Sequence, residues 1–317
     1  MRILDVFAPN RAEQIELVPL SVDHLEPYLE MLGDEEGRRL TATTAKFDRQ
    51  QIVDWLASRA AASNRKDWAI LNGSGDFVGE VVLNEFDDGK NQMNLRIALR
   101  GPAYFSRGFG RQAIALALEY AFDELALDKV TLSVLVDNPR AIRSYLAVGF
   151  VKGREYSEKR FRFQRMSITK LQFVSALGGR ALQQFLQPGW SFSVDSAKRR
   201  AGLCNYSSKV ISLSRYYIDL HSVDDCLQVL AHELGHATAG KAAGHGRTWL
   251  AAAKKFGYRN EKFTGVTIAE EHAPWLGVCP AGHEHFRYRK PTRALSCLKC
   301  SSQFSTKHLI AWTKRNV

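Results

Sequence analysis

The stretch "AHELGHATAGKAAGHGRTW", residues 231–249, holds three histidines and one glutamate. Apolar residues at helical spacing predict that its first part is a helix. On a helix, His232 and His236 lie one turn apart and face the same way, so their imidazoles can bind one metal ion. Glu233, beside the first histidine, can then reach a water on that metal, which is the H-E-x-x-H arrangement.

A catalytic zinc site needs three protein ligands and an open position for water. The third candidate ligand is His245, because the glycine-rich segment "AGKAAGHG" lets the chain leave the helix and fold back toward the metal. Bound zinc lowers the pKa of water, and Glu233 can take the proton during attack on a carbonyl carbon. A chance H-E-x-x-H on an ordinary helix is the alternative, and the third histidine weighs against it.

The residues around this motif follow a recognisable order. Residues 190–214, "WSFSVDSAKRRAGLCNYSSKVISLS", alternate like a hairpin, and Ser222 with Asp225 predicts the helix start. "HELGH" and "HGRTW" come next. This order resembles the SprT-like metalloprotease family over residues 189–260. The resemblance implies an α+β zincin-like fold with zinc on the three histidines and the glutamate as general base. Its eukaryotic Spartan relatives degrade proteins crosslinked to DNA.

The end of the chain carries a second group of metal-ligand residue types. Cys297 and Cys300 form a C-x-x-C pair, and SprT-like proteins often end in a zinc ribbon built from two such pairs. The first pair departs from that pattern, because Cys279 is followed by a histidine at the next ligand position. A set of Cys279, His283, Cys297 and Cys300 suits structural zinc, with His285 as a rival fourth ligand. A metal-free loop with reduced thiols is the alternative.

Charge divides the chain unevenly. Residues 1–170 carry 24 Lys+Arg and 24 Asp+Glu, a net charge of 24 − 24 = 0, whereas residues 171–317 carry 20 and 9, a net charge of 20 − 9 = +11. Such asymmetry predicts a polyanionic partner for the second half, most simply DNA or another nucleic acid. "FRYRK", residues 286–290, interleaves basic and aromatic residues in a way that suits base stacking and phosphate contacts. A solubilising surface is the alternative.

The first half alternates strands with helices, which predicts an α/β domain that ends near residue 168. Residues 11–33 predict a strand, a polar turn and a helix. A helix-containing connector is expected over residues 171–189, with Gly178-Gly179 and Pro188-Gly189 as breakers. The other predicted strands are 67–71, 76–86, 93–101, 129–137 and 161–169, and the predicted helices are 111–127 and 139–149.

The turn "RGFGRQA", residues 107–113, lies between a predicted strand and a predicted helix. Its glycines allow a close backbone approach, and the helix start offers N–H groups to a phosphate. "DNPRAIRSYLAVGF", residues 137–150, adds the spacing N-x-x-A-x-x-x-Y-x-x-x-G-F. Together these segments resemble the GNAT acetyltransferases over residues 15–168, in the style of the RimJ/RimL-like branch, which modifies protein N-termini or small amines.

The GNAT resemblance implies that the loop binds the pyrophosphate of acetyl-CoA through backbone amides. It assigns Asn138 to the cofactor arm and Tyr145 to protonation of the leaving thiolate. Gln112 departs from the family pattern, since Gly or Ala usually stands there, and a larger side chain could crowd the cofactor. Glu85, near a strand end, is a candidate base. The predicted cofactor-binding residues are Arg107, Gly108, Phe109, Gly110, Arg111, Gln112 and Asn138.

These patterns predict an α/β domain of the GNAT type with a mixed sheet, an α+β zincin-like domain and a small zinc ribbon. The expected boundaries are 1–168, a connector over 169–188, then 189–275 and 276–317. We expect a cytoplasmic protein with no membrane partner, because no signal peptide or long apolar run is present and the five cysteines form no disulfide pattern.

Three functions remain open at this point. In the first, both sites are active, giving an acetyl-CoA-dependent N-acetyltransferase joined to a zinc protease that acts on nucleic-acid-associated proteins. Alternatively, the second half is a zinc-containing nucleic-acid-binding module beside an active acetyltransferase, or the first half is a degenerate binding domain beside an active protease.

Overall fold

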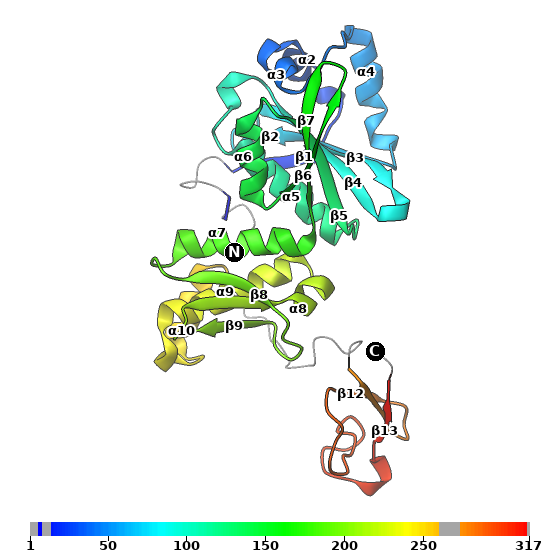
Figure 1. The fold of residues 1–317 in the computed structure, drawn as a ribbon, viewed down its shortest axis with the longest axis vertical. Coiled ribbons are helices and arrows are strands. Elements are labelled where there is room, and N and C mark those ends of the chain that lie inside the picture. Colours follow the sequence, from blue (N-terminus) through cyan, green and yellow to red (C-terminus); the bar gives the residue numbers. More distant parts are fainter. Residues whose placement is uncertain (1–5, 8–13, 260–272, 316–317) are drawn as a thin grey trace.

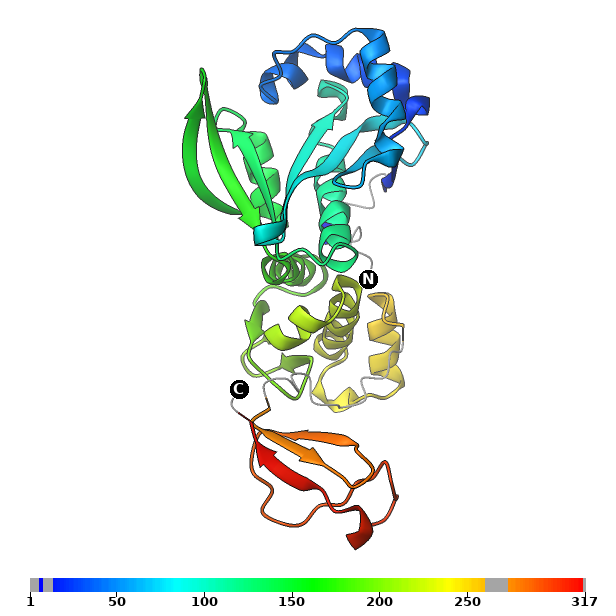
Figure 2. The ribbon, with the colours of Figure 1, turned by 90° about the vertical axis from the view of Figure 1, so that its right-hand side faces the viewer.

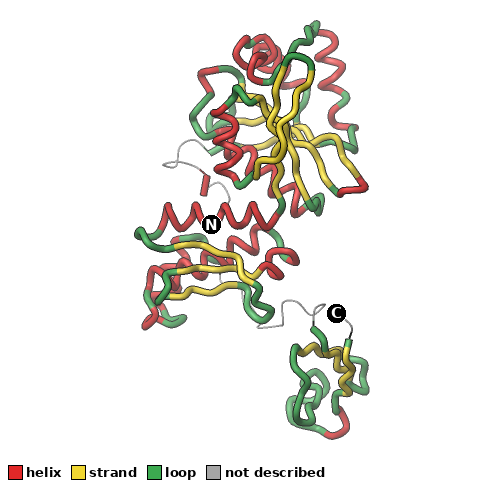
Figure 3. Tube along the Cα trace, in the orientation of Figure 1, coloured by secondary structure: helices red, strands yellow, loops and turns green. Residues whose placement is uncertain are grey.

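The computed structural model describes residues 6–7, 14–259 and 273–315 (Figure 1). A seven-stranded mixed sheet with helices comes first. A smaller α+β part follows, and a three-stranded tail ends the described chain (Figure 3). The architecture predicted from the sequence is confirmed: a mixed sheet with helices, an α+β part and a small tail with a cysteine and histidine cluster. Within the described residues, no helix is both long and apolar enough to cross a membrane.

The large sheet has the strand order β1-β2-β3-β4-β5-β7-β6. All neighbours are antiparallel except β4 and β5, which run parallel. β6 was not predicted, because it is an edge strand with seven of its eight residues exposed and therefore shows no apolar alternation. The strands are β1 (Glu16–Pro19), β2 (Lys66–Leu71), β3 (Phe77–Asp87), β4 (Gln92–Leu99), β5 (Lys129–Leu135), β6 (Val151–Glu158) and β7 (Phe161–Ile168).

The parallel pair is joined only at one end. Gln92, Met93 and Asn94 of β4 pair with the first residues of β5, and the pairing then stops although both strands continue. The carboxyl ends of the two strands therefore diverge, and Figure 2 shows the two parts of the sheet spread apart. This divergence opens the cleft described below.

Helices cover both faces of the sheet. Neighbouring residues of β2 show this: Ile70 belongs to the core under α5, whereas Ala69 belongs to a smaller core under α2 and α4. Successive side chains of a strand point to opposite faces, so the two cores lie on opposite sides. The helices are α2 (Leu25–Gly33), α3 (Glu35–Leu40), α4 (Arg49–Ala57), α5 (Phe109–Asp123) and α6 (Pro139–Val148).

Residues predicted as a broken connector form one continuous helix, α7 (Lys170–Phe185). Thr169 caps its start by accepting a hydrogen bond from the amide of Gln172. The expected break at Gly178 is wrong, because this glycine serves packing: a Cβ there would lie 2.5 Å from the ring of Phe192. The missing side chain lets the next strand cross close to the helix.

The sheet of the second part has the order β8-β10-β9, with β8 (Ser191–Asp195), β9 (Gly202–Asn205) and β10 (Val210–Ser214). The predicted hairpin is correct for β9 and β10, which are antiparallel. β8 instead pairs in parallel with β10, because residues 196–201 carry the chain across to the other edge. Alternation alone predicts a strand but not its neighbour.

The helices of the second part are α8 (Arg215–Leu220), α9 (Val223–Ala239) and α10 (Arg247–Lys255). The predicted cap of α9 is confirmed, since Ser222 and Asp225 form a capping box. The predicted boundary between residues 275 and 276 falls inside β11 (Trp275–Val278), a strand of the tail, and residues 260–272 before it lie outside the described residues.

The two larger parts share one hydrophobic core, which includes Phe122 of α5, Phe173 of α7 and Leu227 of α9. A polar contact joins them as well. Asp123, the last residue of α5, accepts hydrogen bonds at 3.0 and 2.8 Å from the amide of Val223, the first residue of α9. The ammonium group of Lys170 lies 3.1 Å from the same carboxylate. The last residue of α5 thus contacts the first residue of α9.

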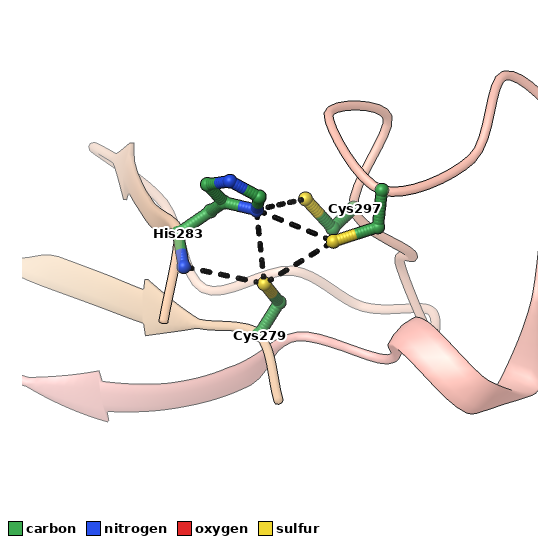
Figure 4. Close-up of side chains that lie close together, drawn as sticks. Cys279, His283 and Cys297 are labelled. Atoms are coloured by element: carbon green, nitrogen blue, oxygen red, sulfur yellow. Dashed lines mark hydrogen bonds between the residues drawn. The ribbon is translucent and has the colours of Figure 1, made fainter. Parts of the chain in front are cut away.

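The tail contains β11 (Trp275–Val278), β12 (Glu284–Arg287) and β13 (Ala311–Lys314) in the antiparallel order β12-β11-β13. Gly277 lies close to the ring of Trp312, where a Cβ would approach within 2.8 Å. Sheets this small need further support, and the cysteine and histidine cluster lies at the ends of these strands (Figure 4).

Candidate functional site

The divergence of β4 and β5 opens a cleft of about 1470 Å³. Its walls come from α2–α4, from the central strands and from the starts of α5 and α6. Seven residues singled out from the sequence line it together: Glu85, Gly108, Phe109, Gly110, Arg111, Asn138 and Tyr145.

The start of α5 supplies backbone N–H groups to this cleft. Gly108 is the N-cap residue, with a φ of 89°, a conformation that favours glycine. No side chain caps this helix end, and the first turn of a helix leaves N–H groups without partners inside the helix. The positive end of the helix dipole lies there too, so the arrangement suits a phosphate group.

Two residues predicted to bind cofactor lie outside the lining of the cleft. The exposed guanidinium of Arg107 packs 4.8 Å from the ring centre of Phe109. The side chain of Gln112 is fully buried in the core. The backbone N–H of Gln112 donates to the carbonyl of Gly108 and is therefore not available to a cofactor. The expected crowding by Gln112 therefore has no counterpart in the cleft, since its side chain is directed into the protein.

Asn138 and Tyr145 lie at the start and near the end of α6. Asn138 caps α6 by accepting a hydrogen bond at 3.1 Å from the amide of Ala141. Tyr145 is only 7% exposed, and burial raises the pKa of its hydroxyl. The hydroxyl therefore keeps its proton at neutral pH and can donate it inside the cleft.

The cleft contains a half-buried carboxylate, Glu80, that the sequence analysis missed. Glu80 of β3 accepts a hydrogen bond at 3.1 Å from the hydroxyl of Tyr28. Burial raises the pKa of Glu80, while Arg96 acts in the opposite direction. Glu85 also lines the cleft, but it is exposed. A single charged residue in the apolar run "FVGEVVL" was the signal that could have identified Glu80.

The second part brings the three histidines of the motif together. The Nε2 atoms of His232 and His236 are 3.1 Å apart, and Nε2 of His245 lies 3.1 and 3.2 Å from them. Three nitrogens at these separations can all lie about 2.0 Å from one zinc ion. Burial lowers the pKa of His232 to about 4 and also lowers that of His236, so both imidazoles are neutral and able to act as ligands at neutral pH.

The carboxylate of Glu233 lies beside Gly202 of β9. It is not part of the group formed by the three histidines, whose possible ligand atoms all lie within 4.8 Å of one another. Burial raises the pKa of Glu233 to about 7, and Arg200 and the amide of Cys204 act against this rise. Gly202 leaves room for the carboxylate, because a Cβ there would lie 2.8 Å from its Oε1. A carboxylate with this pKa suits proton transfer near neutral pH.

Aromatic side chains support the histidine triad. The ring of Trp249 lies 4.6 Å from that of His245 and 4.7 Å from that of His232, and its indole N–H donates to the carbonyl of His232 at 3.4 Å. Tyr258 packs 5.5 Å from His232 and was not singled out from the sequence. These contacts fix the ring orientations that a shared metal would need.

The tail gathers Cys279, His283, Cys297 and Cys300, as Figure 4 shows. Nδ1 of His283 lies 3.2 Å from Sγ of Cys300, 3.5 Å from that of Cys279 and 3.6 Å from that of Cys297. His285, the rival ligand, is not part of this group. Three thiols and one imidazole so close together suit a closed, four-coordinate zinc site.

Comparisons with known proteins divide the chain in the same way. Residues 14–151 match the model of the acetyltransferase (GNAT) domain, and residues 171–272 match that of the SprT-like family. Spermidine N(1)-acetyltransferase of Vibrio cholerae is 31% identical over 107 residues, which are 34% of this chain and 61% of that protein. The chain thus spans less than two thirds of that relative's length.

Other relatives are more distant. Alpha/beta-tubulin-N-acetyltransferase 9 of Drosophila melanogaster is 25% identical over 158 residues, which are 44% of this chain and 77% of that protein. The crystal structure of the Vibrio cholerae spermidine N-acetyltransferase in complex with CoA and spermine has a TM-score of 0.46 and 21% identity. It covers 51% of this chain and 98% of that one.

Proposed function

The chain joins a GNAT acetyltransferase domain to a SprT-like domain, and from this we propose that it is a bifunctional enzyme: an acetyl-CoA-dependent N-acetyltransferase and a zinc-dependent protease. The start of α5 and Tyr145, which line one cleft, support the first activity. The mutual 3.1–3.2 Å spacing of three Nε2 atoms supports the second. We place the domain boundary before α7, which the SprT-like match includes almost entirely.

Acetyl-CoA supplies the acetyl group as a thioester. The amides at Gly108–Arg111 bind its pyrophosphate, and the diverging edges of β4 and β5 offer backbone groups to its arm. Glu80, with a raised pKa, accepts the proton of the attacking amine. Tyr145 donates its proton to the departing thiolate, and burial keeps that proton in place until transfer.

The acceptor is a primary amine on a small molecule or a protein N-terminus. The Vibrio cholerae relative is named for spermidine and the Drosophila relative for tubulin, so the relatives support the class of reaction and leave the acceptor open between these two kinds. The aromatic rings of Tyr28 and Trp55 at the far end of the cleft, together with Glu80, suit an ammonium group next to an apolar stem.

For the protease, His232, His236 and His245 would hold zinc, which when bound supplies carbonyl polarisation and water activation. Glu233 takes the proton of the attacking water and passes it to the leaving amine. We further propose that the cysteine and histidine cluster of the tail holds a second, structural zinc. The basic second half would attract nucleic-acid-associated protein substrates. None of the five cysteines forms a disulfide, and we propose a cytoplasmic location, where thiols stay reduced.

Three measurements on the full chain test this proposal. Isothermal titration with acetyl-CoA should give saturable binding at one site, and metal analysis should give two zinc ions per chain. Peptide hydrolysis should be abolished by a chelator and restored by zinc. No acetyl-CoA binding would leave a degenerate first domain beside a protease. Zinc without hydrolysis of any peptide or protein tested would leave an acetyltransferase with a metal-containing binding module.

A further inference from the structure

Strands β3 and β4 place a carboxylate and a guanidinium on the same face of the large sheet. Glu80 of β3 pairs with Ala98 of β4, and two residues away Arg96 of β4 pairs with Val82 of β3. Paired residues share a face of the sheet, so Glu80 and Arg96 are diagonal neighbours, which usually lie about 7–8 Å apart. The charge of Arg96 opposes the rise that burial causes in the pKa of Glu80. Both residues line the cleft.

The guanidinium of Arg96 is exposed in the cleft, and within the described residues it makes no ion pair and no hydrogen bond. Other cations of the cleft are already bound within the protein. Arg65 lies 2.5 Å from the carboxylate of Asp67. Arg38 donates a hydrogen bond at 3.2 Å to the carbonyl of Leu32. Arg96 is therefore available to bind an anionic group of a ligand.

An apolar wall stands beside Glu80. The hydroxyl of Tyr28 donates to Oε2 of Glu80 at 3.1 Å, and its ring stacks on that of Trp55 with 5.5 Å between the ring centres. Met31 and Ile52 belong to the same small core and also line the cleft. A ligand whose amine faces Glu80 can therefore pack an apolar group against these side chains.

An unpaired cation, a proton-accepting carboxylate and an apolar wall together match a molecule with a carboxylate, an amine and an apolar side chain. We propose that the acceptor of the acetyl group is a free amino acid with an apolar side chain, whose carboxylate binds Arg96 and whose amine faces Glu80. A polyamine would instead bring a like charge to Arg96. This inference deepens the proposed acetyltransferase activity and rests on it.

The transfer step uses groups already described. The neutral amine attacks the acetyl carbon, so that a C–N bond forms and the C–S bond of the thioester breaks. The proton that the nitrogen loses goes to Glu80, and the departing thiolate takes the proton of Tyr145. Proton exchange with water then restores both side chains. Arg96 takes part in no bond change: two parallel hydrogen bonds to the carboxylate of the amino acid orient its amine toward the thioester.

The first test compares acceptors for the full chain with saturating acetyl-CoA. They are L-leucine, L-leucinamide, 3-methylbutylamine, spermidine and a hexapeptide that begins with leucine. Leucinamide lacks the negative charge of the carboxylate, and 3-methylbutylamine lacks the whole group. Mass spectrometry of the acetylated products gives initial rates. Leucine should have a kcat/KM at least about tenfold higher than each other acceptor, because it alone makes the charge-assisted contact with Arg96.

The second test replaces Arg96 and a matched arginine. Arg96→Gln should lower kcat/KM for leucine by about tenfold or more, mainly through a higher KM, and should change that for 3-methylbutylamine by less than about threefold. Arg96→Lys keeps the charge without the planar fork and should recover part of the loss. Arg154→Gln removes the same charge from the exposed strand β6, outside the cleft lining, and should leave every rate within about twofold. Acetyl-CoA titration and melting temperature are the folding controls.

Equal losses for leucine and 3-methylbutylamine in Arg96→Gln would overturn the role of Arg96, because the loss would then not depend on the carboxylate. Faster transfer to spermidine or to the hexapeptide than to leucine would overturn the acceptor class, whereas the acetyltransferase would stand. If acetyl-CoA binds but none of the five amines is acetylated, the proposed acetyltransferase activity fails and this inference fails with it.

Discussion

The acetyl-CoA cleft and the histidine site are built from different parts of the chain. The cleft presents backbone amides at the start of α5, where no side chain is needed to bind a phosphate. The histidine site presents three imidazoles, and each imidazole would be one of three protein ligands of the metal. A backbone site tolerates most side-chain changes nearby, whereas a side-chain site loses its ligand when one residue changes. The following predictions test this difference, from the largest effect to the smallest.

Substitution at the histidine site should have the largest effect. Glu233→Gln should keep zinc and lower peptide hydrolysis by about 10²–10⁴-fold, because the general base is lost while the ligands remain. His232→Ala is the matched variant and should lose both zinc and hydrolysis. Hydrolysis rates and zinc content are measured together. A Glu233→Gln protein that cleaves as fast as wild type would show that another group takes the proton.

In the cleft, the side chain with the largest expected effect is Tyr145. Tyr145→Phe should keep acetyl-CoA affinity and slow acetyl transfer by roughly tenfold to a thousandfold, because the proton donor to the thiolate is lost. The measurement is single-turnover transfer at saturating acetyl-CoA, with titration calorimetry as the binding control. Equal transfer rates for the two proteins would remove Tyr145 from this role.

The contact between the two regions should matter for stability. Asp123→Ala removes the acceptor of the Val223 amide and one of the acceptors of the Lys170 ammonium, which also donates to the carbonyl of His221, and should lower the free energy of unfolding by about 2 kcal/mol. Asp123→Asn retains an acceptor oxygen and should lose less. Denaturant unfolding followed by tryptophan fluorescence gives both values. An unchanged midpoint in Asp123→Ala would mean that the contact contributes nothing to stability.

Glu119, one helical turn before Asp123 in α5, should give stability a pH dependence. Burial raises the pKa of Glu119 from its ordinary 4.5 to about 7, and Asp123 and Asp224 add to this rise. Because the folded pKa is higher than the unfolded one, the stability that Glu119 contributes is present below pH 4.5 and is lost as the pH rises through 7. Glu119→Gln lacks this loss, so it should exceed wild type by on the order of 1 kcal/mol at pH 8 and by less at pH 5.5, after allowance for solvent screening. A stability difference that is the same at both pH values would contradict this assignment.

The smallest effect should come from Arg107. Arg107→Ala should change acetyl-CoA affinity by less than about threefold, because its exposed side chain lies outside the cleft lining and surface substitutions are usually worth less than 0.5 kcal/mol. Gly108→Ala is the contrasting variant: it forces a Cβ into left-handed backbone, which costs about 1–2 kcal/mol, and should weaken binding more. The opposite order of affinities would show that a side chain, and not the backbone, binds the phosphates.

The sequence predicted those parts of the structure that leave a local signal. The spacing of His232 and His236 fixed their common helix face, and the capping pair at Ser222 marked where that helix starts. The C-x-x-C pair of Cys297 and Cys300 predicted the metal-ligand cluster in the tail. The sequence alone could not decide whether His283 or His285 is the fourth ligand, because their spacing from Cys279 differs by only two residues. The folded tail brings His283, and not His285, to the three cysteines.

The sequence did not predict features that depend on residues far apart in the chain. β8 pairs in parallel across the sheet, and nothing in its own residues specifies that neighbour. Gly178 was predicted to break the helix, because its packing partner, Phe192, lies on a different element and cannot be identified from the local sequence. The same holds for Glu80, whose role depends on Tyr28 from α2, fifty-two positions away. Distant partners of this kind are set by tertiary packing.

The hydrogen bond from Val223 to Asp123 has an evolutionary consequence. A residue that ends one helix and accepts a hydrogen bond from the first amide of another belongs to two domains at once, so selection on either domain acts on the same codon. Changes at this position would need to be matched by changes at Lys170. The two domains are then inherited as one unit: recombination that replaced one of them would bring in a partner surface that had not evolved with the other.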